Sequence, residues 1–123
     1  LTILVPFTAD HMLVQEASYS YFRKLIHRGA DIYQYLKGFY HAKVLIIDDE
    51  ICDLGTANFD KRSFFLNHEI NCFIYDKSVI RQIKGIINKD LQDSQKVSLD
   101  YLCSPNLFRS FKETIASSIS FFL

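Results

Sequence analysis

The chain has 123 residues, which is close to the usual size of one domain. Apolar residues make up 49% of it, with eleven Phe and seven Tyr, and this composition excludes intrinsic disorder. The formal net charge is zero, which argues against a dedicated nucleic-acid-binding protein because such proteins are usually basic. The longest purely aliphatic run, 44–47, is far short of the roughly 20 residues that span a bilayer.

The hydrophobic pattern predicts strands interleaved with helices. An apolar run predicts a strand over 1–5, and apolar side chains at helical spacing predict a helix over 12–28 that stops at Gly29. The segment 58–67 is expected to be irregular or a short helical turn. Runs rich in β-branched and aromatic residues predict four further strands, over 30–36, 41–47, 51–56 and 69–75.

The remaining sequence predicts two more helices. Ser78 is a suitable N-cap for a helix over 78–91, and a polar connector is expected over 92–97. Ser104 and Pro105 are suited to begin a last helix, as N-cap and first helical residue. The alternation indicates an α/β (α+β) fold in which helices cover one mixed β-sheet. Because no linker is visible, we expect residues 1–123 to form one domain.

The clearest functional pattern begins at His41. His41 and Lys43 lie two positions apart in a predicted strand, where side chains alternate between faces, so both are expected on one face. An imidazole can attack phosphorus or transfer a proton, and a nearby ammonium can stabilise the charge that develops on a phosphoryl group. The pair therefore favours chemistry on a phosphate ester.

Two further pieces follow at short distances along the chain. Gly-Thr-Ala-Asn at 55–58 supplies small and polar groups, and Asn-His-Glu at 67–69 supplies a carboxylate. A lone histidine on a strand is more often structural than catalytic. The spacing His-x-Lys-x4-Asp, however, is expected by chance only at roughly the per-cent level in a chain of this length. Together the three pieces indicate phosphodiester chemistry.

The chain resembles the phospholipase D superfamily, whose mark is His-x-Lys-x4-Asp followed by Gly-Ser/Thr-x-Asn. The likeness extends to the C-terminal motif region of bacterial cardiolipin synthases. It rests on His-Ala-Lys-Val-Leu-Ile-Ile-Asp-Asp-Glu from position 41, Gly-Thr-Ala-Asn-Phe-Asp-Lys-Arg-Ser from 55 and Leu-Asn-His-Glu from 66. The stretches 17–22 and 29–33 fit the same family, so the resemblance covers nearly the whole chain.

The resemblance implies a phospholipase D-like fold and an active site built from two copies of the motif. One histidine attacks phosphorus and forms a phosphohistidine, and the other protonates the leaving alcohol and then deprotonates the acceptor. The implied reaction joins two phosphatidylglycerol molecules into cardiolipin, and it needs no metal or other cofactor. Because only one copy of the motif is present, the chain is expected to be the C-terminal half of a longer protein.

The candidate catalytic residues are His41, Lys43, Asp48, Asn58 and Glu69. The resemblance implies that His41 is one of the two histidines, and in the C-terminal copy it is more often the general acid/base than the nucleophile. Lys43 and Asn58 would bind the phosphoryl oxygens together with the hydroxyl group of Thr56. Gly55 would let the backbone and the substrate approach closely.

Asp48 and Glu69 are interpreted differently from each other. Asp48 lies seven positions after His41, and this odd separation would turn its side chain to the opposite face of a straight strand. We therefore interpret Asp48 as a structural residue of the turn. Glu69 is the better candidate to orient a catalytic imidazole through its second ring nitrogen. The simpler alternative for Glu69 is an exposed carboxylate at the start of a strand.

The resemblance also implies a location and partners. The longer protein would lie at the bacterial cell membrane and act on a phospholipid, whereas this chain alone would be soluble. The missing half of the site would come from a second motif-bearing domain of the same protein or from an identical subunit. Nucleic acid is not expected as a substrate because the chain is neutral.

Three functions are compatible with the sequence. The first is a catalytic half of a phosphatidyltransferase, and the second is a homodimeric phosphodiesterase or nuclease with one motif per subunit. The third is a non-catalytic half that completes the site of a partner domain. The isolated chain is expected to be inactive unless it dimerises, because one histidine cannot serve both chemical roles.

Overall fold

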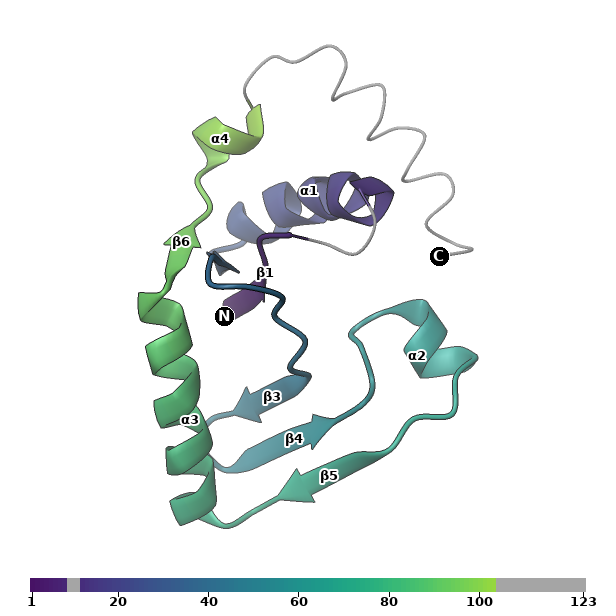
Figure 1. Ribbon diagram of the computed structural model, residues 1–123, viewed down its shortest axis with the longest axis vertical. Coiled ribbons are helices and arrows are strands. Elements are labelled where there is room, and N and C mark those ends of the chain that lie inside the picture. Colours follow the sequence, from purple (N-terminus) through teal and green to yellow (C-terminus); the bar gives the residue numbers. More distant parts are fainter. Residues whose placement is uncertain (9–11, 104–123) are drawn as a thin grey trace. The chain divides into compact units, whose positions relative to one another are not determined.

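The computed structural model of the protein describes residues 1–8 and 12–103 (Figure 1). These residues form two compact units. The first unit contains the described residues of 1–40 and 93–103, and the second is His41–Gln92. Helices and strands alternate along the chain, so the predicted α/β (α+β) class is confirmed. The helix predicted from Ser104 lies outside the described residues.

The first unit contains a mixed three-stranded sheet in the order β1-β2-β6. β1 (Thr2–Pro6) and β2 (Asp31–Tyr35) pair in parallel, and α1 (Met12–Ile26) connects them, as a parallel pair requires a long crossover. β6 (Ser94–Lys96) pairs antiparallel with β2 in the segment predicted as a polar connector. That prediction was wrong because β6 is too short and polar to show a strand pattern, and its pairing depends on the neighbouring β2.

The predicted stop of α1 at Gly29 is confirmed. The backbone N–H of Ala30 donates to the carbonyl of Leu25 over 3.0 Å, and the N–H of Gly29 donates to Ile26 over 2.9 Å. These two bonds form a Schellman motif, in which the residue after the helix takes a left-handed conformation. Gly29 has a φ of 85° and takes that conformation without a Cβ penalty.

Buried side chains from α1, β2 and the segment after β6 form the core of the first unit. Tyr19, Ile32, Val97 and Leu102 are at most 5% exposed and pack together. Leu102 lies in the short helix α4 (Leu99–Cys103), which the sequence did not predict. The core therefore joins parts of the chain that are about seventy residues apart in sequence.

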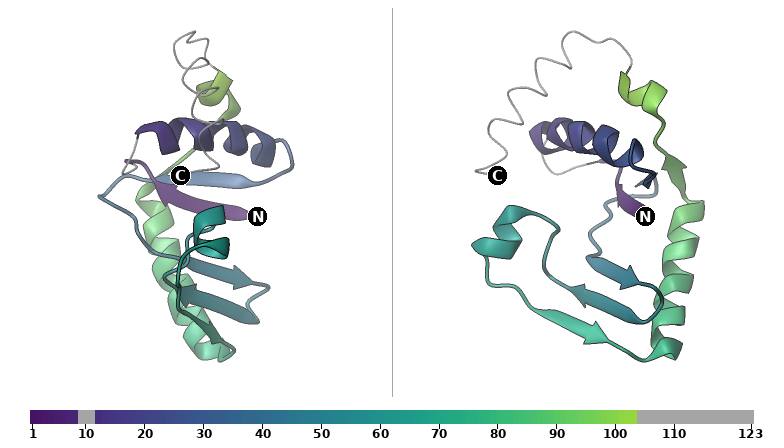
Figure 2. Two further views of the ribbon diagram at one scale, coloured as in Figure 1. Left: turned by 90° about the vertical axis from the view of Figure 1, so that its right-hand side faces the viewer. Right: turned by 180° about the vertical axis from the view of Figure 1, so that it is seen from behind.

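The second unit contains an antiparallel sheet in the order β3-β4-β5. Its strands are β3 (Val44–Ile47), β4 (Ile51–Gly55) and β5 (Asn71–Ile74). The helices α2 (Lys61–Phe65) and α3 (Lys77–Gln92) lie toward opposite ends of this sheet (Figures 1 and 2). The strands of the chain are thus divided between two sheets rather than gathered in one, because β3 to β5 pair only with one another.

The N-terminus of α3 differs from the sequence prediction. The helix begins at Lys77, and the Asp76 carboxylate accepts bonds from the backbone N–H groups of Ser78 at 2.7 Å and Val79 at 3.3 Å. Asp76 is therefore the N-cap in place of Ser78, whose hydroxyl group also donates to Asp76. These bonds, led by the one from the Ser78 hydroxyl, lower the pKa of Asp76.

Candidate active site

The strand predicted over 41–47 begins only at Val44, so His41 and Lys43 precede it. The ladder between β3 and β4 ends at the pair Val44 and Leu54, with one further bond from the Gly55 N–H to the Lys43 carbonyl at 3.2 Å. Strand alternation therefore does not determine the direction of the His41 side chain. The physical reason is that β4 ends at Gly55 and offers no further strand to pair with.

Lys43 nevertheless lies close to His41. Its ammonium nitrogen Nζ donates a hydrogen bond to the backbone carbonyl of His41 over 2.9 Å. His41 is exposed to solvent, and Lys43 is half-buried. The lysine charge and the histidine thus occupy one short exposed segment at the start of β3.

The Gly-Thr-Ala-Asn segment 55–58, called here the motif loop, turns its backbone N–H groups inward. The N–H of Thr56 donates to the Ile70 carbonyl at 3.0 Å, and that of Ala57 donates to Asn71 Oδ1 at 3.3 Å. The N–H of Asn58 donates to Ser63 Oγ at 3.1 Å. With the bond from Gly55, all four N–H groups of the loop have protein acceptors.

This arrangement differs from a glycine-rich phosphate loop, which offers its backbone N–H groups to the ligand. Here a phosphate would have to be bound by side chains. Asn58 is exposed, and within the described residues its side-chain amide makes no hydrogen bond to the protein. The Asn58 amide is therefore open to an external acceptor.

Glu69 accepts hydrogen bonds from several neighbouring side chains. The hydroxyl group of Thr56 donates to Glu69 Oε2 over 2.6 Å, and the side-chain amide of Asn67 donates to Oε1 over 3.1 Å. Thr56 Oγ1 in turn accepts the N–H of Ile70 at 2.9 Å. The hydroxyl group of Thr56, which was expected to bind a phosphate, thus donates to the carboxylate of Glu69.

These contacts keep Glu69 ionised. The hydrogen bond from Thr56 lowers the pKa of Glu69 most, followed by those from Asn67 and Ser63, and the positive charge of Lys43 lowers it further. The N–H of Gly55 donates to the Lys43 carbonyl, and the hydroxyl group of Thr56 donates to Glu69, so three separate stretches of sequence meet at the motif loop.

The short helix α2 supports the motif loop from its other side. Asp60 is its N-cap, and its carboxylate accepts the N–H of Ser63 over 2.7 Å. The Ser63 side chain is buried and accepts the N–H of Asn58. Asp60 and Ser63 therefore fix the backbone from which Asn58 projects.

Asp48 is not brought to this group. It lies in the turn between β3 and β4, at the opposite end of β3 from Lys43. A strand of four residues is about 13 Å long. Asp48 and Asp49 both have positive φ, 52° and 57°, as the central residues of a type I′ hairpin turn do. Asp49 also pairs with Lys84 of α3 at 2.6 Å.

Sequence reasoning missed Asn71 and Asp53. Asn71 is the first residue of β5 and lies two positions after Glu69. An amide side chain so close to Glu69 was a weak signal of a role at the site. Asp53 lies in β4 among apolar residues, where a carboxylate is unusual. Neither signal identifies a contact between the two residues, because the contact depends on the register of β4 and β5.

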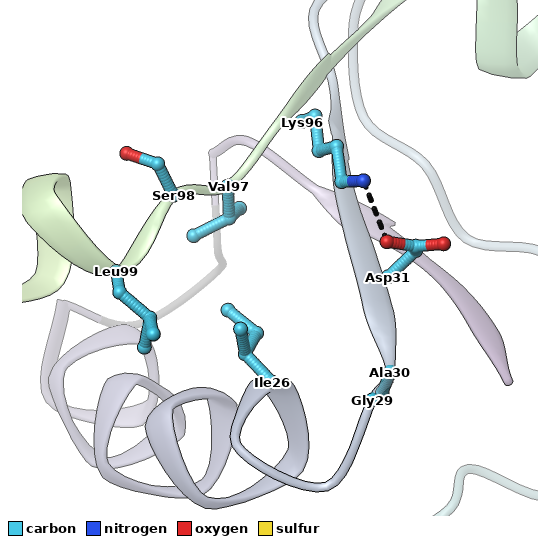
Figure 3. Close-up of a pocket in the computed structure, with 8 residues that line it drawn as sticks. All are labelled: Ile26, Gly29, Ala30, Asp31, Lys96, Val97, Ser98 and Leu99. Carbon is cyan, nitrogen blue, oxygen red and sulfur yellow. Dashed lines mark ion pairs between the residues drawn. The ribbon is translucent and has the colours of Figure 1, made fainter.

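The described residues hold no group of three or more His, Cys, Asp or Glu side chains that could bind a metal ion. Within the same residues, no helix is both long enough and apolar enough to cross a bilayer. Side chains of the first unit line a hollow of about 420 Å³, which is bounded by Ile26, Val97 and Leu99 and by the ion pair of Asp31 with Lys96 (Figure 3). No motif residue lines this hollow, so we do not assign it to the chemistry.

The histidine–lysine segment, the motif loop and Glu69 all belong to the second unit of this α/β structure. Residues 1–91 match the family described as "Cardiolipin synthase, PLD-like domain". The chain belongs to this family, as its sequence indicated.

Named relatives agree with the family assignment. The chain is 40% identical to minor cardiolipin synthase ClsB of Bacillus subtilis over 121 residues, and 41% identical to cardiolipin synthase 2 of Staphylococcus epidermidis over 120 residues. These alignments cover 98% of this chain but only 30% and 25% of the relatives. Probable cardiolipin synthase YwiE of Bacillus subtilis is 46% identical over 78% of this chain. No solved structure matches the chain.

Proposed function

We propose that this chain is a catalytic half of a phosphatidyltransferase that joins two phosphatidylglycerol molecules into cardiolipin and releases glycerol. The observation that carries the proposal is that Lys43 and Glu69 both meet the motif loop, through the bonds from Gly55 and Thr56, while the backbone of that loop leaves phosphate binding to side chains. The names of the relatives support this particular transfer, and residues 1–123 would act as one phospholipase D-like domain.

The reaction takes place in two displacements at phosphorus. In the first, an imidazole nitrogen forms a bond to phosphorus, and the bond to the glycerol oxygen breaks while a second imidazolium protonates that oxygen. In the second, the neutral imidazole takes the proton from a hydroxyl group of another phosphatidylglycerol. The resulting oxygen bonds to phosphorus, and the phosphorus–nitrogen bond breaks. His41 takes one of these two roles.

Lys43 and Asn58 stabilise the phosphoryl oxygens in this scheme. The charge on these oxygens grows as the attacking and leaving groups share phosphorus, so a preformed ammonium and an amide donor lower the barrier. Because the backbone N–H groups of the motif loop already have acceptors, they contribute no donors of their own.

Glu69 orients a catalytic imidazole by accepting its second N–H. The low pKa of Glu69 suits this role, because an ionised carboxylate fixes the tautomer of the ring and stabilises the imidazolium. Thr56 and Asn67 hold the carboxylate in place. Asp48 acts only in the hairpin turn.

The site needs a second motif to be complete. The chain spans between about a fifth and a third of the curated relatives it matches, and we propose that another part of the same protein supplies the second histidine and lysine. The lipid substrate would hold the intact protein at the bacterial cell membrane. An identical subunit is the alternative source of the second motif.

The test uses the intact protein that contains this chain, together with vesicles of labelled phosphatidylglycerol. We expect equal amounts of cardiolipin and glycerol, measured by mass spectrometry, and about a 10³-fold lower rate for Lys43→Gln. His27→Ala, at an exposed histidine of the first unit, is the matched control and should keep the wild-type rate. Phosphatidic acid in place of cardiolipin would identify a hydrolase, and no turnover would favour the non-catalytic alternative.

A rapid acid quench tests the covalent intermediate. During turnover we expect a phosphatidyl group on one histidine, detected by peptide mass spectrometry. A modified His41 would make it the nucleophile, whereas modification of the other motif's histidine would make His41 the acid/base. Turnover without any trapped histidine adduct would contradict a phosphohistidine mechanism.

A further inference from the structure

We propose that Asn71 is a positioning residue that fixes the motif loop for phosphate binding, and that Asp53 holds Asn71 in the required orientation. This inference rests on the proposed function, because it assigns a role at the same site. It assigns roles to two side chains that lie outside the histidine–lysine and Gly-Thr-Ala-Asn pieces. The residues that carry it are the side chains of Asn71 and Asp53 and the backbone of Ala57.

The hydrogen bonds of Asn71 run in two directions. Its nitrogen Nδ2 donates to both carboxylate oxygens of Asp53, each at 2.9 Å. Its oxygen Oδ1 accepts the backbone N–H of Ala57 at 3.3 Å. A carboxylate can only accept and a backbone N–H can only donate, so the two neighbours determine which end of the amide is which.

Few other side chains can make both contacts. An aspartate at position 71 could accept from Ala57, but it would set a second carboxylate against Asp53. A leucine of similar size could make neither bond. An amide at position 71 is therefore required as long as position 53 is a carboxylate.

Gly55 allows this contact to form. A Cβ atom at position 55 would collide with the side chain of Asn71 and with the backbone carbonyl of Ile70. The backbone carbonyl cannot move aside as a flexible side chain can, so even alanine would push β4 and β5 apart. The glycine of the motif thus serves the internal packing of the loop.

The contact acts on the phosphate-binding residues through the backbone. Ala57 lies between Thr56 and Asn58, so fixing its N–H fixes the peptide planes on either side of it. The bonds from Thr56 to Ile70 and from Asn58 to Ser63 hold the neighbouring positions. Without Asn71 the N–H groups of Thr56 and Asn58 would keep their acceptors, but that of Ala57 would lose its acceptor. The backbone at Ala57 could then move, and the Asn58 amide would lose its fixed direction.

The experiment exchanges the two side chains in the intact protein. Asn71→Asp sets two carboxylates together, whereas Asp53→Asn keeps one acceptor oxygen for Asn71 and so weakens the contact less. The double variant restores both bonds in reverse, because the amide at 53 donates to the carboxylate at 71, which still accepts from Ala57. The double variant also has the net charge of the wild type. Asn88→Asp, on the exposed surface of α3, is the matched control for one added charge.

Two readouts are measured on each variant. Amide hydrogen exchange reports the Ala57 N–H directly, and we expect about tenfold faster exchange in Asn71→Asp and wild-type exchange in the double variant. Cardiolipin formation at saturating phosphatidylglycerol should fall about 10-fold to 10²-fold in Asn71→Asp, fall less in Asp53→Asn, and recover to within about threefold in the double variant. KM should change less than kcat, because the geometry of the transition state is affected most.

The outcomes separate the two proposals. Slow Ala57 exchange in Asn71→Asp, or a double variant whose Ala57 N–H exchanges as fast as that of Asn71→Asp, would overturn the positioning role. If the wild type makes no cardiolipin, the proposed function fails, and rescue of Ala57 exchange alone still decides whether Asn71 fixes the loop. Thermal unfolding of every variant distinguishes loss of the loop contact from loss of the fold.

Discussion

The two units of the molecule are stabilised in different ways. In the first unit, Tyr19, Ile32, Val97 and Leu102 form a cluster of buried apolar side chains. In the second unit, the buried side chains among the described residues are Cys52, Ser63 and Ile80, from three different elements. The motif lies in the second unit and is held mainly by hydrogen bonds.

Apolar burial and hydrogen bonding contribute different properties. Burial stabilises without direction, so it holds α1 on its sheet and tolerates small shifts. Hydrogen bonds lose strength steeply with angle, so they fix the orientation of a loop. A site that must present an ammonium, an amide and a carboxylate in fixed positions benefits from the second kind of contact.

The second unit also exposes large apolar side chains close to the motif loop. Those that are at least three-quarters exposed are Phe59, Phe65, Leu66 and Ile70. Their burial cannot explain the positions of the site residues. The contrast between the units therefore predicts that substitutions in the first unit change stability, whereas those around the motif loop change activity.

The largest expected effect is that of His41→Ala. Under the proposed function, this variant lacks one of the two imidazoles and should lose at least about 10³-fold in rate. Because His41 is exposed and precedes β3, its free energy of unfolding should stay within about 0.5 kcal/mol of wild type. Cardiolipin formation and chemical denaturation measure the two quantities, and a destabilised His41→Ala would break the contrast between the units.

Ile32→Ala should show the opposite pattern. Ile32 is fully buried in β2, and removing its side chain should lower the free energy of unfolding by about 2–5 kcal/mol. Phe65→Ala removes a larger side chain that is 80% exposed, and it should cost no more than about 0.5 kcal/mol. Denaturant titration compares the two, and equal losses would show that the second unit depends on apolar burial after all.

A smaller effect is expected at the start of α3. Asp76→Ala removes the N-cap and should lower the free energy of unfolding by about 1 kcal/mol. Ser78→Ala keeps the capping carboxylate and should cost less. If Ser78→Ala proved the more damaging change in thermal unfolding, the sequence-based cap would be right and the observed one wrong.

The smallest expected effect is a pH dependence from Glu69. Its pKa is lowered in the folded protein, so its contribution to stability is present above the ordinary value of about 4.3 and is lost as the pH falls through the lowered value. Glu69→Gln should remove this part of the pH dependence and leave the rest. NMR titration of the Glu69 carboxyl carbon measures the pKa, and a value at or above 4.3 would contradict the bonds from Thr56 and Asn67.

Much of the local structure could be predicted from the sequence. Gly29 identified the end of α1 because few other residues take a left-handed conformation easily. Runs rich in β-branched and aromatic residues located β3 to β5 to within a few residues. The spacing of His41, Lys43 and Asn58 identified the family, because the order of chemical groups along the chain is a property of sequence alone.

The tertiary structure decided how these pieces meet. The register of β4 and β5 sets Asn71 beside Asp53 and Ala57, and the turn at Asp48 carries that residue away from Lys43. Neither result is visible in the sequence, because a hydrogen bond between strands depends on pairing between distant segments. The sequence thus determined which chemical groups the protein carries. Only the fold decided which of them share one site, since directional contacts exist only after the strands have paired.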